Sequence, residues 1–546
     1  MQLIKFSFKY IFQYGIYYFL LIICQIIKAI IIIVLPYMSG IFIDCLLEQL
    51  SLNVIYKFAI IYSVLGVLQI ILLYLSTILQ IHVHNNSNIT LLSDITKHMQ
   101  KLPLSFYTNK DTAYIVHRIQ NDSNTVITFV LTNTIDFISN IITTATTFYI
   151  VYKVSSLICV IYIFALIIYL IQYIFTKKML YSSSRKAREI ESQFFSEFLK
   201  QFKYLRIIKL FNIGNFFNGK LDSSYKSLYN VTMKLQKVMC IFQSNQIIIS
   251  TLFKIVLLLF GGIQVINGNI SIGIFSTLLG YLGVVLNSVV YFANLGQSYV
   301  STLVSYNRLK ELFNLSEETN GKEILTHIET ISIQNLSYGY NGNFLIQKFN
   351  YLFEKGKIYC ICGANGVGKT TFLDILVGLN QEYIGEILYN QNKNLINIDH
   401  YKMREQLCCY VSQDILLYED SIINNILINR SDISRREVET LAKQIGLFQE
   451  SNLNTCLTLD YIINDNKENL SGGERQKIAL LRSFITIKDL IIYDEPTSYL
   501  DSKAKKFFIG KLIEMKDQNR IIIVITHDNE LSKYCDDVID LEYFKK

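Results

Sequence analysis

Long apolar segments alternate with polar ones over the first 300 residues of this 546-residue chain. A helix needs ~20 apolar residues to cross ~30 Å of hydrocarbon. The second, fourth and sixth of the segments that reach this length contain no Asp, Glu, Lys or Arg. The pattern predicts an α-helical membrane domain, residues 1–313, with six transmembrane helices. They are Ile11–Met38, Phe58–His82, Val126–Tyr152, Val154–Phe175, Val238–Ile266 and Ile270–Asn294.

The polar stretches 83–125 and 176–237 are too long to be turns. Apolar residues recur in them at helical spacing, for example at Phe194, Phe198 and Phe202. We therefore expect the membrane helices to continue through both stretches. The alternative is a small separate domain, but neither stretch is large enough to bury its own core.

Positive charges indicate the orientation of the chain. Lys and Arg collect on the cytoplasmic side of membrane proteins, and the 176–237 stretch is rich in both, whereas the predicted outer loop 267–269 has neither. We predict a multi-pass protein of the cytoplasmic membrane, in contact with the lipid bilayer, whose C-terminal half is cytoplasmic. The same bias accounts for the net charge of +7. We expect no nucleic-acid binding, because no basic stripe is interleaved with aromatic residues.

The pattern changes after residues 314–330, a polar segment that we interpret as a linker. Short apolar runs bounded by glycine turns then alternate with helical patterns, which is typical of an α/β domain with a parallel sheet. We assign residues 331–546 to this domain. Its predicted buried strands are Ile358–Cys362, Cys408–Val411, Leu490–Tyr493 and Ile521–Ile525.

A glycine-rich loop directly follows the first of these strands. Its sequence, Gly363-Ala364-Asn365-Gly366-Val367-Gly368-Lys369-Thr370-Thr371, fits the P-loop pattern G-x-x-x-x-G-K-[ST] and runs into a predicted helix. Backbone N–H groups of such a loop surround phosphates, and the helix N-terminus favours negative charge. We predict an ATP site in which Lys369 contacts the β- and γ-phosphates and Thr370 binds Mg²⁺. The other candidate nucleotide-binding residues of the loop are Gly363, Asn365, Gly366, Gly368 and Thr371.

Two carboxylates end the predicted strand Leu490–Tyr493. Asp494 is a candidate Mg²⁺ ligand, as at the end of a Walker B strand. Glu495 is placed one residue further on, where it could activate an attacking water as general base. A solvated turn with two acids is the alternative, and the P-loop makes it the weaker one.

Further motifs accompany the P-loop. Leu470-Ser471-Gly472-Gly473-Glu474-Arg475-Gln476 resembles the signature motif of ABC ATPases. Gln413, the run Ser498–Asp501 and the run Ile525–Asp528 are similar to the family's Q-, D- and H-loops. Tyr340 falls where the family has its adenine-stacking aromatic residue, with Tyr338 as the alternative. The resemblance spans about residues 331–540 and implies a P-loop NTPase domain of the ABC type.

The resemblance implies a role for each motif. In ABC proteins two ATPase domains meet head to tail with two ATP molecules between them, so Ser471, Gly472 and Gly473 would contact the γ-phosphate on the partner's P-loop. His527 would hold that phosphate, and Gln413 would sense the metal or the water. Glu474 and Asp501 complete the candidate nucleotide-binding residues. One ATPase domain with six spans is half of a working unit. The intact residue set favours a homodimer over a heterodimer.

The membrane half is similar to the ABC exporter fold. Residues 102–107 with 118–122, and residues 206–212, look like the family's two intracellular loops, which carry short coupling helices. The chain departs from the family pattern at Ala113, at Gly214-Asn215 and at residues 464–468. These departures affect the expected coupling contacts and not the expected ATPase.

Three classes of function compete. The first is an exporter of a peptide, lipid or amphipathic small molecule; the second is an importer with an exporter-like fold, of the siderophore type; the third is an ABC ATPase without transport. Six spans argue against the third class. The signature variant with Glu474 and the short membrane half resemble bacteriocin and peptide exporters, which favours peptide cargo. Because the first span begins within about ten residues of Met1, we expect no peptidase domain for leader processing.

Charged residues inside the predicted spans are candidates for cargo binding, because a charge in the membrane is costly. They are Lys28, Asp136 and Lys254. The alternative is that they pair across helices or reach to the interface. The 10 cysteines have no zinc-finger spacing, and we interpret them as small buried apolar residues.

Overall fold

The computed structural model describes residues 2–48, 52–108, 112–340, 343–428, 430, 432–448, 457–463 and 470–544. Contacts divide the chain into two compact units. The helical unit comprises Met1–Gln100 and Asp111–Leu315, and the α/β unit comprises Lys101–Lys110 and Ser316–Lys546. The short segment 101–110, which lies between two helices of the first unit in sequence, therefore packs with the second.

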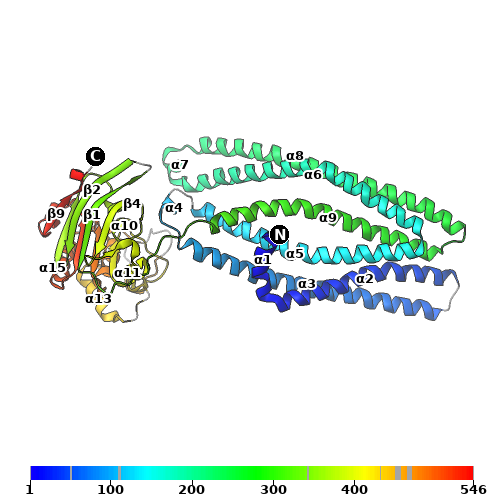
Figure 1. Ribbon diagram of the computed structural model, residues 1–546, viewed down its shortest axis with the longest axis horizontal. Coiled ribbons are helices and arrows are strands. Elements are labelled where there is room, and N and C mark those ends of the chain that lie inside the picture. Colours follow the sequence, from blue (N-terminus) through cyan, green and yellow to red (C-terminus); the bar gives the residue numbers. More distant parts are fainter. Residues whose placement is uncertain are drawn as a thin grey trace. The chain divides into compact units, whose positions relative to one another are not determined.

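Long helices make up the helical unit (Figure 1). Within the described residues, six of them are long and apolar enough to cross a membrane, which confirms the predicted spans. They also extend well beyond the apolar segments, so the expected helical continuations are confirmed. The helices are α2 (Gly15–Leu47), α3 (Leu52–Met99), α5 (Thr112–Val154), α6 (Ser156–Lys203), α8 (Gly214–Ile266) and α9 (Ile272–Phe313).

The first span differs from the prediction at its start. An amphipathic helix α1 (Gln2–Ile11) precedes it and buries Leu3, Tyr10 and Ile11. The 3₁₀ turn η1 (Phe12–Tyr14) then interrupts the chain, and α2 begins at Gly15. The candidate span Gln2–Leu47 includes the predicted start at Ile11, but the break was not predicted, because a continuous apolar sequence does not reveal a local change in helix geometry.

Polar side chains fix the ends of the long helices. Ser155 and Ser271 cap α6 and α9 by accepting hydrogen bonds from Ile158 N–H and Ile274 N–H. At the start of α9, Asp44 of α2 also accepts a hydrogen bond from Gly273 N–H at 2.7 Å. A carboxylate is favourable at a helix N-terminus. Glycine is required here, because a Cβ on Gly40 would lie 2.4 Å from the carbonyl oxygen of Gly273.

Two short helices lie in the expected intracellular loops. Helix α4 (Ser105–Thr108) follows α3, and α7 (Leu205–Phe211) joins α6 to α8. Both positions match the loops that resemble those of ABC exporters. Of the two, α4 belongs to the α/β unit, where Lys101 C=O accepts a hydrogen bond from Glu318 N–H at 2.8 Å.

The α/β unit contains two sheets among its described residues. The parallel sheet has the order β6 (Cys408–Val411), β7 (Leu490–Asp494), β8 (Ile521–Ile525), β3 (Lys357–Cys362) and β9 (Asp537–Asp540). The four predicted strands are all in it, and their parallel pairing is confirmed. The antiparallel sheet, which the sequence analysis did not separate, has the order β2 (Asn343–Glu354), β1 (Thr330–Tyr340), β4 (Tyr383–Tyr389) and β5 (Lys393–Asn394).

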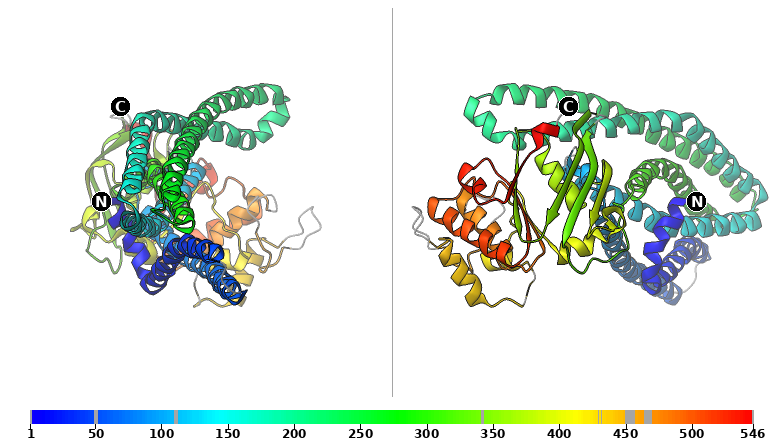
Figure 2. Two further views of the ribbon diagram at one scale, coloured as in Figure 1. Left: turned by 90° about the vertical axis from the view of Figure 1, so that its right-hand side faces the viewer. Right: turned by 60° about the vertical axis from the view of Figure 1, so that its left-hand side comes forward.

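The parallel sheet is buried on both faces, as its uninterrupted apolar strands predict. Ile492 and Ile523 belong to a core shared with the antiparallel sheet and α10 (Lys369–Leu376). Their neighbours Ile491 and Ile522 belong to a second core on the opposite face. Figure 2 shows the helices of that second core, drawn in yellow to orange-red. They are α12 (Ile422–Leu427), α13 (Arg435–Gln444), α14 (Gly472–Phe484) and α15 (Ser502–Asp517).

The remaining short elements border this framework. They are η2 (Leu395–Asn397), α11 (His400–Gln406), α16 (Asn529–Ser532) and η3 (Leu541–Phe544). The segment before β1 also packs on the α/β unit. Gly321 N–H donates to Ile398 C=O at 3.0 Å, and Glu323 N–H donates to Asn397 C=O, in η2, at 2.9 Å. The predicted linker is thus hydrogen-bonded to the α/β unit along part of its length.

Candidate functional site

The glycine-rich loop joins β3 to α10, as predicted. Gly363, Gly366 and Gly368 have φ angles of +140°, +81° and +101°, which L side chains rarely adopt. Asn365 lies at the exposed turn between them, and Thr371 lies in the first turn of α10. A glycine-rich loop that leads directly into a helix N-terminus is the arrangement that binds phosphate.

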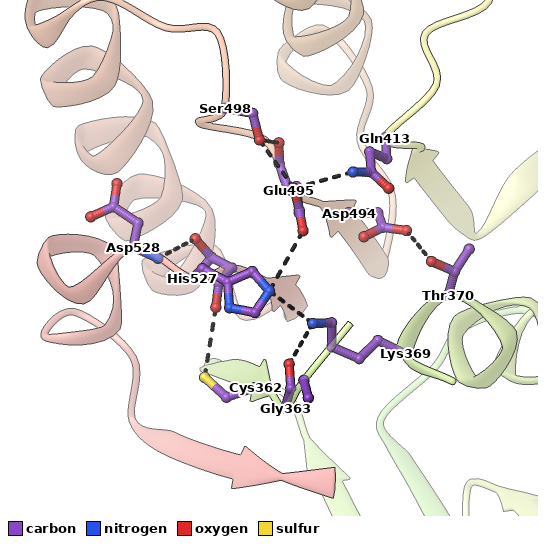
Figure 3. A network of polar contacts seen from close by, with 12 residues as sticks. Cys362, Gly363, Lys369, Thr370, Gln413, Asp494, Glu495, Ser498, His527 and Asp528 are labelled. Carbon is purple, nitrogen blue, oxygen red and sulfur yellow. Dashed lines mark hydrogen bonds and ion pairs between the residues drawn. The ribbon is translucent and has the colours of Figure 1, made fainter. Parts of the chain in front are cut away.

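Lys369 is the first residue of α10 and is only 8% exposed. Its Nζ donates a hydrogen bond to Gly363 C=O at 2.6 Å and lies 2.9 Å from Nε2 of His527 (Figure 3). A buried ammonium group without a carboxylate partner among these contacts is favourable only where an anion can approach it. The loop and the lysine together make a site for a polyphosphate.

Thr370 and Asp494 bring two oxygen ligands together. Thr370 Oγ1 donates to Asp494 Oδ2 at 2.8 Å, and Asp494 is 2% exposed at the end of β7. Burial raises the pKa of Asp494, and the Thr370 hydroxyl partly offsets this rise. A divalent cation would stabilise the ionised carboxylate, and Mg²⁺ prefers such oxygen ligands. The residues present therefore fit a Mg²⁺ ion.

Glu495 lies at the centre of the polar network in Figure 3. Its backbone has a left-handed φ of +49°, a strained conformation for a residue other than glycine, which is typical of functional sites. One carboxylate oxygen accepts a hydrogen bond from Gln413 Nε2 at 3.2 Å and another from Ser498 Oγ at 3.3 Å. The other oxygen lies 3.7 Å from His527 Nε2. The structure thus brings Gln413, Glu495 and His527 together from three separate loops.

The signature residues form the N-terminus of α14. Ser471 caps the helix by accepting from Glu474 N–H, and the Glu474 carboxylate accepts from Ser471 N–H at 2.7 Å, which completes a capping box. A Cβ on Gly473 would lie 2.8 Å from Tyr499 C=O, so the helix start packs tightly on the D-loop. Glu474 therefore has a structural role in the cap, and a contact with nucleotide remains a prediction.

Asp501 ends the D-loop and caps α15 by accepting from Ala504 N–H at 2.8 Å. Its carboxylate also pairs with Lys477 Nζ of α14 at 2.7 Å, and the hydrogen bond from that lysine lowers the pKa of Asp501. The D-loop is thus fixed to the signature helix. Asp501 points into this structural pair in the single chain, and its nucleotide contact remains a prediction.

The aromatic candidates differ in position. Tyr338 is 1% exposed, and its hydroxyl donates to Gly368 C=O at 3.1 Å. It therefore supports the glycine-rich loop from beneath and is not available to stack on a base. Tyr340 ends strand β1, and its side chain lies outside the described residues.

One contact of the glycine-rich loop involves a residue that the sequence did not predict. Ala364 N–H donates to Glu542 Oε1 at 2.7 Å. Glu542 lies in η3, near the end of the described chain, and Phe544 anchors that turn edge-to-face on Phe349 of β2 with ring centroids 4.9 Å apart. The only sequence signal was an acidic residue soon after the short strand β9, itself half aspartate.

The charged candidates of the helical unit are not equivalent. Lys28 Nζ donates to Ser76 Oγ at 2.7 Å and interacts electrostatically with Asp136, so helices α2, α3 and α5 bring these groups together. Lys254 lies on α8 and is exposed. It is not part of this pair.

Comparisons with known proteins agree with this arrangement. Two family models match the chain: ABC transporter transmembrane region over residues 18–289, and ABC transporter over residues 346–498. A solved bacterial Atm1-family ABC exporter with ATP bound is similar in fold, with a TM-score of 0.84, 17% identity, and coverage of 96% of this chain and 92% of that one.

Three relatives illustrate the range of similar proteins. The lactococcin-G-processing and transport ATP-binding protein LagD of Lactococcus lactis subsp. lactis is 26% identical over 82% of this chain. The α-hemolysin translocation ATP-binding protein HlyB of Escherichia coli O157:H7 is 24% identical over 87%, and the ATP-dependent lipid A-core flippase of Desulfotalea psychrophila is 25% identical over 79%. The chain spans 63%, 67% and 76% of the length of these three relatives, respectively.

The span-length helices of the described residues and the matching exporters make the chain a multi-pass membrane protein whose ATPase domain is cytoplasmic. The P-loop, Gln413, the signature and the strand-end acids lie within the matched residues 346–498, and His527 lies beyond them. The chain belongs to the ABC transporter family and joins, in one polypeptide, an exporter-type transmembrane region and the ATPase domain that this family couples to transport.

Proposed function

We propose that the chain is one half of an ATP-driven exporter that works by alternating access. The observation that carries this proposal is the convergence of Lys369, Thr370, Asp494, Glu495 and His527 around one point, on a polypeptide that also holds span-length helices. A binding module without hydrolysis would need the P-loop but not the strained carboxylate beside it.

The residues of the site divide the work of hydrolysis. Lys369 and the P-loop N–H groups bind the β- and γ-phosphates. Thr370 and Asp494 would hold Mg²⁺, with Gln413 as a further candidate ligand; the ion would neutralise charge on the phosphates. Glu495 accepts a proton from the attacking water, and Gln413 and Ser498 orient its carboxylate by their hydrogen bonds. His527 holds the γ-phosphate and keeps the water in line.

A second copy completes the site. The N-terminus of α14 is capped by Ser471 and Glu474, and a helix N-terminus favours an anion. We infer that Ser471, Gly472 and Gly473 contact the γ-phosphate on the P-loop of the partner chain. Because the chain has a full set of motif residues, an identical chain is the simplest partner.

One backbone contact and the continuity of the chain support coupling to the membrane region. The segment Lys101–Lys110, with helix α4, is part of the α/β unit and is bonded to the chain just before β1. It is covalently continuous with α3 and leads into α5. Closing two ATPase domains around nucleotide would therefore move these helices and change which side of the membrane the cargo path faces.

Peptide cargo is favoured, because two of the three relatives named above are, by name, a lactococcin-G transporter and an α-hemolysin translocator. The flippase among the relatives makes a lipid or amphipathic drug the second candidate. An importer with an exporter-like fold is the third. Inside-out vesicles distinguish export from import, since an exporter accumulates labelled peptide in the lumen when ATP is added outside.

Complementation between two inactive variants tests the shared site. Lys369→Ala removes the phosphate-binding lysine, and Ser471→Arg blocks the signature. If ATP lies between chains, a mixed dimer has one composite site with both defects and one site with neither. Each variant alone should be inactive, and co-expressed chains purified through two different tags should recover hydrolysis. Absence of recovery in such purified mixed dimers would mean that each site is built within one chain.

A further inference from the structure

Glu495 has a backbone conformation that its neighbour in sequence does not favour. A proline pushes the residue before it toward extended conformations, and Glu495 precedes Pro496. The φ angle of Glu495 is nevertheless +49°, in the left-handed region. Such a conformation persists only where the surrounding structure over-determines it. Contacts made on either side of Glu495 must therefore hold it there.

Hydrogen bonds fix the backbone immediately before and after this strained residue. Glu495 N–H donates to Ile525 C=O of β8 at 2.9 Å. On the other side, Gln476 Nε2 of α14 donates to Pro496 C=O at 2.9 Å. Pro496 is buried and has no N–H, so this carbonyl is its only backbone hydrogen-bonding group. Its partner is the amide of Gln476, a side chain that is itself only 1% exposed.

The rest of this loop, which ends at Asp501, is fastened to the same helix. Lys477, the residue after Gln476, pairs with Asp501 at 2.7 Å. Between these two points, a Cβ on Gly473 would lie 2.8 Å from Tyr499 C=O, so the backbones of α14 and the loop are in close contact. The loop is therefore held by α14 at its start, its middle and its end.

Ser498 lies in this loop and connects it to the carboxylate of Glu495. Its hydroxyl donates to Glu495 Oε2 at 3.3 Å, and Gln413 Nε2 donates to the same oxygen at 3.2 Å (Figure 3). Rotation about φ turns the Cα–Cβ bond relative to β7. A return of φ to the ordinary negative range would therefore move the carboxylate away from both donors.

We propose that Gln476 is a positioning residue for ATP hydrolysis. Its hydrogen bond to Pro496 C=O holds Glu495 in the left-handed conformation in which the carboxylate can accept a proton from the attacking water. Gln476 acts through the backbone of Glu495 and takes no part in the proton transfer. The inference rests on the proposed function, in which Glu495 is the general base.

A glutamine suits this position better than side chains of similar length do. Its amide has two N–H donors, whereas an ionised glutamate would place a carboxylate against the Pro496 carbonyl. A methionine has no donor, and loss of its partner destabilises a buried carbonyl by more than the bond itself stabilises it. Movement of the loop would bring that carbonyl to water and release the strain at Glu495. Both effects favour a displaced loop once the donor is lost.

The experiment compares Gln476→Met with the unchanged full chain in lipid nanodiscs. Loss of the donor should lower kcat for ATP hydrolysis about tenfold, since misplacing a catalytic group by ~1 Å can cost ~10²-fold in rate. The dissociation constant of a fluorescent ATP analogue should stay unchanged, because the P-loop is intact. Hydrogen exchange, read by mass in peptides that contain Ser498 and Leu500, should become faster. Gln444→Met, the same change at an exposed position on α13, should alter none of the three.

A double variant separates positioning from a general effect on the fold. If Gln476 acts through Glu495, it has no base to position in a chain that carries Glu495→Gln. Glu495→Gln/Gln476→Met should then hydrolyse ATP no more slowly than Glu495→Gln in a single-turnover assay, whereas a purely structural role would slow both backgrounds by the same factor. Gln476→Asn, whose amide is one methylene too short to reach Pro496 C=O, should reproduce the loss of kcat, and it tests the inference if Gln476→Met does not fold.

The outcomes distinguish this inference from the proposed function. Faster exchange in Gln476→Met, together with no hydrolysis by the unchanged chain, contradicts the proposed function alone. Unchanged exchange overturns the anchoring of the loop by Gln476. Faster exchange with unchanged kcat, or a fall in kcat that persists in the Glu495→Gln background, overturns its role in positioning the base.

Discussion

The central strands of the parallel sheet and the membrane helices are both apolar, yet their side chains lie in opposite surroundings. Every residue of β7 and β8 is buried. By contrast, only 6% of the most apolar window of α3 is buried within the chain. The apolar side chains of the sheet are buried in the core of the α/β unit, whereas those of the helix face lipid and other chains. The sequence of a buried strand therefore predicts which residues lie at each point of the sheet. The sequence of a lipid-facing helix predicts mainly the length of the span.

This difference explains where function is visible in the sequence. The ATP site lies at the carboxyl ends of β3, β7 and β8, where a rigid sheet converts sequence positions into fixed points in space. Its chemistry also needs particular backbone conformations, which only glycine provides cheaply. A cargo path between helices has no such requirement, and its residues are free to vary with the cargo.

The largest effect should come from Glu495. Replacing it with Gln removes the proton acceptor while keeping the shape and the hydrogen bond from Gln413, so we expect hydrolysis to fall about 10²–10⁴-fold. ATP should still bind, as measured with a fluorescent analogue, while phosphate release reports turnover. Glu386→Gln, at an exposed position on β4, is the control. Turnover close to that of the unchanged protein would exclude Glu495 as the base.

A smaller effect, on the KM for ATP, is expected from Glu542, which accepts a hydrogen bond from the P-loop at the edge of the parallel sheet. Glu542→Gln weakens the charged hydrogen bond to Ala364 N–H, and such bonds contribute ~1.5–3 kcal/mol. We expect KM for ATP to rise about tenfold with little change in kcat, because the loop is less well positioned before nucleotide binds. Tyr543→Ala, an exposed side chain in the same turn, should leave KM unchanged. An equal fall in kcat would instead mean that Glu542 acts in the transition state.

The sequence named side chains that the structure brings together at the glycine loop and the strand-end acids, because these motifs have fixed local geometry. Their roles, and the nucleotide contact of the signature, stay predictions. The sequence did not predict Glu542, whose contact depends on how the chain returns after β9. It favoured Tyr340 for adenine stacking, with Tyr338 as the alternative, and it did not reveal the burial of Tyr338 beneath Gly368, which is a tertiary property. In the helical unit it predicted the spans but neither the break at η1 nor the meeting of Lys28 with Ser76 and Asp136, since apolar periodicity does not encode helix neighbours.

Substitution of Lys28 tests whether its interaction with Asp136 stabilises the helical unit. If Lys28 and Asp136 stabilise each other, Lys28→Met leaves a carboxylate unpaired in a poorly hydrated place, and the apparent melting temperature should fall by about 5 °C. The double variant Lys28→Met/Asp136→Asn should recover most of the loss. Lys254→Met, at an exposed position, is the matched control. An unchanged melting temperature in Lys28→Met would mean that the contacts of Lys28 with Ser76 and Asp136 contribute little to stability, which would leave its charge available for cargo.

The smallest expected effect is on thermal stability and concerns a buried histidine in the α/β unit, beside the segment before β1. His400 is 1% exposed; one ring nitrogen lies 2.7 Å from Leu395 C=O, and the other lies 3.2 Å from Gln381 Nε2. Gln381 in turn donates to Thr319 C=O at 2.6 Å. Burial lowers the pKa of His400, with Arg404 adding to the effect and Glu318 and Asp399 opposing it.

Because the folded pKa is the lower one, the unfolded chain binds a proton at mildly acidic pH that the folded chain does not. The free energy of unfolding is therefore undiminished above the ordinary histidine value, ~6.5, and decreases as the pH falls from there toward the folded pKa. The apparent melting temperature should drop a few degrees more between about pH 7.5 and about pH 5.5 in the unchanged protein than in His400→Gln. His327→Gln, which removes an exposed histidine of the same unit, should leave that drop intact. Equal drops in all three proteins would show that His400 is no less easily protonated in the fold than outside it, and that the contact with Gln381 does not depend on its neutral ring.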